Sequence, residues 1–193
     1  AQTAEIGLRR TVGQLRFESS LYYTLYKDFI FKQVTGHFCT DTFATCGATG
    51  PLIQVAYGQR DAVFRGAELS MQLFNSIQHY GLGIVRATFT DGTNVPRIAP
   101  MRLGGGAWWR SAEWYARVGL LHAFTQNDIA PFETPTDGYN LLRAELSYTH
   151  MFNAADNGPR EITIGLAGDN LLNAAIRNHI AFKKAELLQP GLG

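Results

Sequence analysis

The feature that most constrains this chain is a repeated alternation of long amphipathic segments with connections of two lengths. From Glu5 to Asn170 we count eight segments in which polar and apolar side chains alternate. The short connections are Thr11–Gln14, Asn75–Tyr80, Ser111–Glu113 and Asn153–Pro159. Between them come Val34–Gly50, a short hairpin at Asp91–Asn94, Gln126–Gly138 and a tail from Leu171. Short turns at one rim and longer loops at the other are typical of antiparallel barrels that cross an outer membrane.

The composition fits strands that cross a membrane. Charged residues make up 17% of the chain, below the ~25% usual in soluble domains. No run approaches the roughly 18 consecutive apolar residues that indicate a transmembrane helix. A chain like this can span a bilayer only with strands of a sheet that closes, because an open backbone edge cannot face lipid. The net charge of +1, without a basic run, gives no reason to expect a nucleic-acid partner.

Alternation within the segments separates two chemically different faces. One face of the segment after Gln14 carries Leu15, Phe17, Ser19, Leu21, Tyr23 and Leu25, and the other carries Arg16, Glu18, Ser20, Tyr22, Thr24, Tyr26 and Asp28. A later segment alternates Leu142, Ala144, Leu146, Tyr148 and Phe152 with Arg143, Glu145, Ser147 and Thr149. The apolar face could meet lipid around a wet interior, or it could fill a soluble barrel. Alternation alone does not choose between these two arrangements.

Strand length and aromatic placement favour lipid on the apolar side. The segments from Leu15 to about Gln33 and from Leu52 to about Phe74 exceed the ~9–11 residues needed to cross the hydrocarbon layer. Aromatic residues straddle the short turns: Trp108, Trp109, Trp114 and Tyr115 at one, Phe74 and Tyr80 at another. Aromatic rings concentrate at membrane–water boundaries, so we expect these rings to form an interfacial belt.

Four stretches, in order and spread over the whole chain, carry a family resemblance. They are Tyr23–Ile30 (YTLYKDFI), Gln54–Glu68 (QVAYGQRDAVFRGAE), Val95–Leu103 (VPRIAPMRL) and Gly168–Asn173 (GDNLLN). They resemble strand motifs of TonB-dependent outer-membrane receptors, including the pattern polar-polar-Ala-x-x-x-Gly-x-Glu. The resemblance is closest to receptors of the siderophore and metal-uptake type.

The resemblance implies an all-β fold, with about eight strands of a larger transmembrane barrel of the 22-stranded, plugged type. We expect residues 1–193 to be its C-terminal portion, with the plug, the early strands and the closing strand outside the chain. The reason is that the chain starts almost directly in a strand at Glu5 and stops at Leu188–Gly193 without a final aromatic residue.

The implied function is active uptake, in the outer membrane of a Gram-negative bacterium, of a scarce nutrient such as an iron–siderophore or a metal complex. The implied partners are outer-membrane lipid, the small ligand and TonB, which would act through the plug. No cofactor is implied. Two alternatives remain open: a small complete eight-stranded outer-membrane barrel, and a soluble lipocalin-like carrier.

The chain has two cysteines, seven residues apart in the Val34–Gly50 connection. In an oxidising setting outside the cell, Cys39 and Cys46 are predicted to form a disulfide that staples the loop. The alternative is a zinc site that adds His37 and Asp41, since thiolate, imidazole and carboxylate all bind zinc.

Few other residues point to chemistry. His37 and Asp41 in the cysteine loop, with Arg177 and His179 in the tail, are candidate contacts for a ligand arriving from outside. Glu68 and Glu145 are candidate interior carboxylates, but nothing pairs them as a general acid and base. Gly104–Gly106 precedes no helix, so we interpret it as a bend or a close backbone approach. We find no catalytic constellation and do not expect an enzyme.

Overall fold

The computed structural model describes residues 1–73, 78–154 and 158–193, and the described part is a single antiparallel sheet. Its strands are β1 (Gln2–Val12), β2 (Leu15–Cys39), β3 (Cys46–Gly47), β4 (Leu52–Leu73), β5 (Gln78–Phe89), β6 (Arg102–Arg110), β7 (Trp114–Ala123), β8 (Tyr139–Ala154) and β9 (Gly158–Gly168). Eight long strands follow one another as neighbours, and the two-residue β3 pairs only with β2. The predicted all-β fold of about eight antiparallel strands is confirmed. Among the described residues no helix has the length and apolarity to span a membrane.

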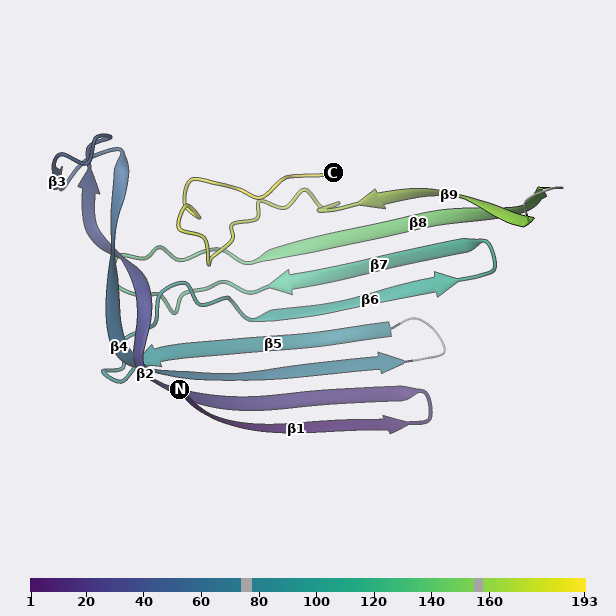
Figure 1. The fold of residues 1–193 in the computed structure, drawn as a ribbon, viewed down its shortest axis with the longest axis horizontal. Helices are drawn as coiled ribbons and strands as arrows, with labels where there is room; N and C mark the ends of the chain where they lie inside the picture. The colour runs from purple at the N-terminus through teal and green to yellow at the C-terminus, as the bar shows by residue number, and fades with distance from the viewer. Residues whose placement is uncertain (74–77, 155–157) are drawn as a thin grey trace.

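All described turns between long strands lie at one end of the sheet, and the longer connections lie at the other (Figure 1). At this end, called the turn rim, Val12 faces Leu15 across Gly13–Gln14, and Arg110 faces Tyr115 across residues 111–114. The opposite end, called the loop rim, carries the cysteine loop, residues 90–101, residues 124–138 and the tail from Asp169. The predicted alternation of the rims is confirmed. The tips of the two other predicted turns, residues 74–77 and 155–157, lie outside the described residues.

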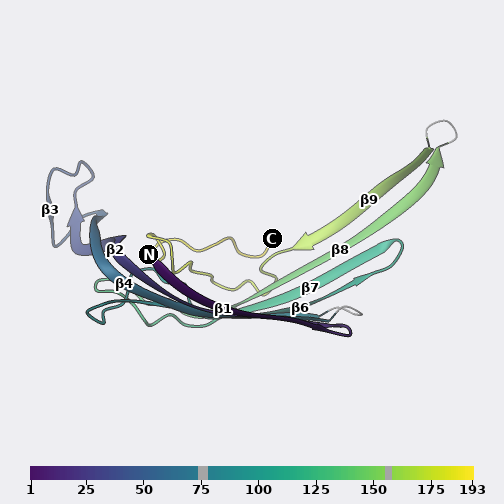
Figure 2. The ribbon, with the colours of Figure 1, turned by 60° about the horizontal axis from the view of Figure 1, so that its bottom comes forward.

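The sheet is a curved, open trough (Figure 2). The order of its strands begins at β1 and ends at β9, and these two edge strands do not pair with each other within the described chain. Ile6 and Leu8 of β1 instead face Leu21 and Ser19 of β2. A small barrel that closes on itself would need direct pairing of β1 with β9.

Register divides the sheet into an apolar face and a polar face, because directly paired residues point to the same side. The apolar face carries Ile6, Leu21, Leu69, Leu82, Leu103, Leu120, Leu146, Ile164 and Leu166. Ile164 and Leu166 are 68% and 75% exposed. The polar face carries Glu5, Arg9, Glu18, Glu68, Arg102, Arg117, Arg143 and Glu145. All of these residues except Glu145 line one hollow, which identifies the polar face as the inner side of the trough. The alternation predicted along each segment is therefore confirmed.

Three of the five described rings of the predicted aromatic belt lie on the apolar face, and Tyr80, which pairs with Met71, is one of them. Trp109 pairs with Ala116, and Trp114 pairs with Tyr148, so both tryptophans lie on the apolar face at the turn rim. Trp108 pairs with Arg117, and Tyr115 pairs with Arg110, which puts these two rings on the polar face. The period of two sends neighbouring residues to opposite sides, so a run of adjacent aromatics cannot all face lipid. Phe74 lies outside the described residues.

Two predicted boundaries were wrong. β2 runs to Cys39 rather than ending near Gln33, because Phe38 and Cys39 pair with both β3 and β4 after a register shift that begins at Val34. The connection around Asp91–Asn94 is not a short hairpin between strands. Thr88 and Asn94 form only an isolated bridge, and β6 starts at Arg102, so the connection covers residues 90–101.

A small aromatic core lies near the loop rim, on the polar side. Its buried members are Phe31, Ala62, Ala87, Phe89 and Val95, with Tyr26, Phe29, Phe64 and Ile98 packed against them. The rings of Phe31 and Phe89 have centroids 4.5 Å apart, a favourable tilted pair. Because Val95 and Ile98 come from residues 90–101, this core fixes that loop onto the sheet.

Candidate ligand site between the polar face and the loop rim

The polar face borders an open hollow of about 1010 Å³, lined by charged side chains, apolar side chains and the bare backbone of glycines. The charged lining residues are Glu5, Arg9, Glu18, Glu68, Arg102, Arg117 and Arg143. Arg9 Nε donates to Glu18 Oε1 at 2.8 Å, while Arg117 faces Glu145 across the β7–β8 pair. A water-filled or plugged barrel interior has this character, whereas a soluble barrel has an apolar one.

Glycines expose the backbone in the middle of this hollow. Gly81 pairs with Gly104, and Gly106 pairs with Gly119, across three neighbouring strands. A Cβ atom on Gly106 would lie 2.7 Å from the carbonyl oxygen of Val118, so no larger residue fits there without a shift. The interpretation of Gly104–Gly106 as a close backbone approach is confirmed, since the approach is to β7. The same glycines leave the polar face open to a large body inside the trough.

The loop rim is organised around the buried carboxylate of Glu133, in the loop 124–138. Lys184 Nζ donates to Glu133 Oε1 at 2.9 Å, the backbone N–H of Arg97 donates to the same oxygen at 3.0 Å, and the N–H of Ala130 donates to Oε2 at 3.1 Å. His179 Nε2 lies 3.4 Å from Oε1. One carboxylate thus joins three separate segments: residues 90–101, residues 124–138 and the tail.

Electrostatics at Glu133 favour the ionised carboxylate despite its burial. Burial opposes the charge, but hydrogen bonds from His179, Lys184 and the Ala130 N–H outweigh it and lower the pKa of Glu133 to about 2. Burial also lowers the pKa of the Lys184 ammonium, and the bond to Glu133 only partly offsets that effect. At neutral pH this is a buried ion pair whose two members depend on each other.

Beside this cluster lies a second hollow, of about 420 Å³, with two cations among aromatic rings. The guanidinium of Arg97 lies 3.8 Å from the centroid of the Phe182 ring, and Lys32 Nζ lies 5.0 Å from the rings of both Phe182 and Tyr57. Arg97 Nη2 donates to the carbonyl of Lys32 at 3.2 Å, but its buried Nε has no hydrogen-bond partner. Lys32 and Arg97 are the charged residues of the lining, which contains no carboxylate. The site can therefore accept a planar anionic group by stacking and charge.

The four candidate ligand contacts are not brought together by the structure. His37 is exposed at the end of β2, and Asp41 is exposed in the cysteine loop. Arg177 Nη1 donates to the carbonyls of Lys184 and Ala185, which fixes the fold of the tail. His179 is 2% exposed, with its Nδ1 at 2.9 Å from the Thr136 hydroxyl. Direct contact of these four residues with a ligand stays a prediction.

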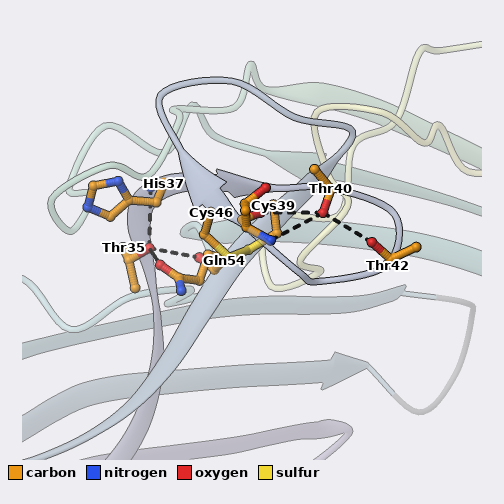
Figure 3. The surroundings of a disulfide bond; sticks show 8 residues. Thr35, His37, Cys39, Thr40, Thr42, Cys46 and Gln54 are labelled. Atoms are coloured by element: carbon orange, nitrogen blue, oxygen red, sulfur yellow. Dashed lines mark hydrogen bonds between the residues drawn. A yellow bond between two sulfur atoms is a disulfide. The ribbon is translucent and has the colours of Figure 1, made fainter.

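The cysteine loop is closed by a disulfide between Cys39 and Cys46 (Figure 3). The alternative zinc site does not form, because both thiols are consumed in the bridge. Among the described residues no group of three His, Cys, Asp or Glu side chains is placed to hold a metal ion. Beside the bridge, the Thr35 hydroxyl donates to Gln54 Oε1 at 2.8 Å and links β2 to β4.

The residues that shape the second hollow were not predicted from the sequence. Arg97 falls inside one of the resemblance motifs, which was the available signal, but Lys32, Glu133, Phe182 and Lys184 carry no local pattern. Glu133 lies 36 and 51 residues from its partners Arg97 and Lys184, and Phe182 lies 85 and 150 residues from Arg97 and Lys32, so only the fold brings them together.

Comparisons with known proteins agree with this architecture. A family described as "TonB dependent receptor-like, beta-barrel" matches residues 1–171. Among solved structures, one described as "Copper transporter OprC" superposes with a TM-score of 0.74 at 17% identity. The match covers 98% of this chain and 30% of that chain. A search of curated proteins found no match. The chain thus belongs to the TonB-dependent receptor-like β-barrel family, whose members are outer-membrane proteins of Gram-negative bacteria.

Proposed function

We propose that this chain is the C-terminal portion of a larger, plugged barrel that takes up a scarce nutrient with energy from TonB. The polar, glycine-rich hollow supports this proposal, because it offers charged groups and bare backbone to a body seated inside the trough. The edges of β1 and β9 support it as well. Each leaves a row of backbone groups that further strands of a larger barrel would pair. TonB would act through that plug, and the chain would have no catalytic role.

The proposed class of substrate rests on the cationic, aromatic hollow at the loop rim. Lys32 and Arg97 supply positive charge, the rings of Tyr57 and Phe182 supply flat apolar surface, and no carboxylate lines the hollow. An anionic metal chelate, such as an iron–siderophore, matches this combination. In this proposal the loop rim faces the outside, as the longer loops of outer-membrane barrels do.

The test uses bacteria in which the native protein containing this chain is the only receptor for the added chelate. Uptake of radiolabelled ferric catecholate and ferric hydroxamate complexes is measured with and without TonB. We expect saturable uptake of one complex that disappears without TonB. Replacing Lys32 and Arg97 together by Gln should raise the half-saturating concentration about tenfold or more, since two charged contacts are lost.

The matched control is Lys183→Gln, which removes an exposed cation from the tail, 69% exposed and outside the hollow. It should leave uptake unchanged. Uptake that is equal with and without TonB would contradict active transport. Uptake equally reduced by both sets of substitutions would show that the hollow is not the contact site.

A further inference from the structure

Two arginines lie side by side on the apolar face of the sheet, where charged side chains are disfavoured. Arg65 of β4 and Arg86 of β5 are direct cross-strand partners, and Arg65 also faces Tyr23 of β2. All three residues belong to the apolar face, and below the arginines on that face come Ala67 and Ile84, followed by Leu69 and Leu82. Like charges placed directly opposite each other destabilise a sheet unless an anion lies between them.

Few acidic side chains among the described residues lie near this pair of arginines. None of the ion pairs among the described residues includes Arg65. Arg86 Nη2 lies 3.5 Å from Asp128 Oδ2, but both side chains are more than half exposed, and such a contact is weak. Asp61, on the same face of β4, is four residues further along, about 13 Å away. The group of Arg65, Arg86 and Asp128 therefore keeps a net positive charge.

The depth of the two arginines in the membrane can be calculated from their positions along β4 and β5. Arg65 and Arg86 are each eight residues from the turn-rim ends of β4 and β5, at Leu73 and Gln78. At about 3.3 Å per residue this is roughly 26 Å along the strand, or about 20 Å of depth for a strand tilted by ~40°. The apolar band of outer-membrane barrels is about 25 Å tall. The long arginine side chains can reach the remaining distance to its upper boundary.

We propose that Arg65 and Arg86 form a binding site for the phosphorylated head group of lipid A, the glycolipid of the outer leaflet. Guanidinium groups bind phosphate oxygens through paired, charge-assisted hydrogen bonds. The acyl chains of the same molecule lie against the leucines below the pair, and the Tyr23 ring lies beside it at the boundary. This site is on the outside of the barrel and takes no part in uptake.

The experiment titrates the delipidated native protein, folded in detergent, with lipid A and counts bound lipid by native mass spectrometry. The double substitution Arg65→Gln/Arg86→Gln should weaken binding about tenfold or more. The matched control is Arg10→Gln. Arg10 lies on the same apolar face but at the turn rim, where it pairs with Phe17. It should change the affinity less than about twofold, well under the effect of one charge-assisted hydrogen bond.

A second comparison needs no substitution and holds even if the double variant fails to fold. The unchanged protein should bind dephosphorylated lipid A about tenfold more weakly than lipid A, since the phosphate contacts are lost. Equal binding of the two lipids would overturn the proposal. So would an unaltered affinity in the folded double variant, an equal loss in Arg10→Gln, or phosphatidylglycerol binding as tightly as lipid A. Because the readout is lipid binding, it does not depend on whether the protein imports a chelate.

Discussion

Replacing Glu133 by Gln should loosen the loop rim without unfolding the barrel. Gln has nearly the same shape as Glu, but it cannot ionise, so Lys184 Nζ would lose its charged partner at 2.9 Å while staying buried. The N–H of Arg97, which donates to the same oxygen, would in one orientation of the amide meet an NH₂ group instead. The strands lie outside this network, so only the three segments held by Glu133 should respond.

The magnitude follows from the pKa. The Glu133 carboxyl titrates at about 2 in the folded protein against an ordinary value of 4.5. At about 1.4 kcal/mol per unit, ionisation of Glu133 stabilises the folded loops by about 3 kcal/mol. Breaking a buried pair by removing one partner costs about 3–5 kcal/mol, which agrees. Because the folded pKa is the lower one, this stability is complete above about pH 5 and is lost as the pH falls from 4.5 towards 2.

Hydrogen exchange of the native protein measures the effect segment by segment. In Glu133→Gln we expect amides of residues 90–101, 124–138 and the tail to exchange about a hundredfold faster at neutral pH, with β4 and β7 unchanged. At low pH the protection factors of these amides in the wild type should fall to those of the variant, while the protection factors of the variant should not depend on the ionisation of residue 133. The control is Glu186→Gln, whose carboxylate is 53% exposed and 4.0 Å from Lys183. Unchanged exchange in Glu133→Gln, or an equal change in Glu186→Gln, would refute the role given to Glu133.

Three further predictions concern other parts of the chain. Protein isolated without reductant should show no free thiol, and a labelled thiol in the unreduced protein would contradict this. Replacing Cys39 and Cys46 by Ser should destabilise the loop between them by about 2 kcal/mol while leaving the strands intact. Ile164→Arg, on the apolar face, should lower the free energy of unfolding of the barrel in vesicles by about 2–4 kcal/mol, whereas Thr163→Arg on the polar face should have little effect. Equal decreases of this free energy in urea titrations would show that the faces are misassigned. Gly106→Ala should slow barrel folding or lower the yield of folded protein, because the new Cβ meets the Val118 carbonyl. Gly83→Ala, with nothing within 4 Å of its Cβ, should fold like the wild type, and equal yields of the two variants would argue against the close approach.

The strands and their faces could be predicted from the sequence because a two-residue period is a local property. Leu142 to Tyr148 alternate with Arg143 to Ser147, and the register keeps them on opposite faces. The prediction placed the adjacent residues Trp108 and Trp109 in one belt, although neighbouring residues of a strand point to opposite faces of the sheet. The end of β2 was missed because its pairing depends on β3, which lies beyond a loop.

The loop-rim site could not be predicted in the same way. Glu133 is held by groups on the 90–101 connection and on the tail, at separations of 36 and 51 residues. No spacing rule joins an irregular loop to such partners. His179 was a candidate contact for a ligand arriving from outside, and the structure buries it against Thr136 and Lys184, because the tail folds back over the loop 124–138.

The measurement that tests the central claim most directly is the intact mass of the polypeptide that carries this sequence, purified from outer membranes. This chain has a mass of 21.3 kDa and covers 30% of the solved transporter that it resembles. A plugged uptake receptor should therefore have about three times that mass, and β1 and β9 should each be paired with strands outside this chain. A mature polypeptide of about 21 kDa, with β1 laddered directly to β9, would contradict the account and indicate a small barrel complete in itself.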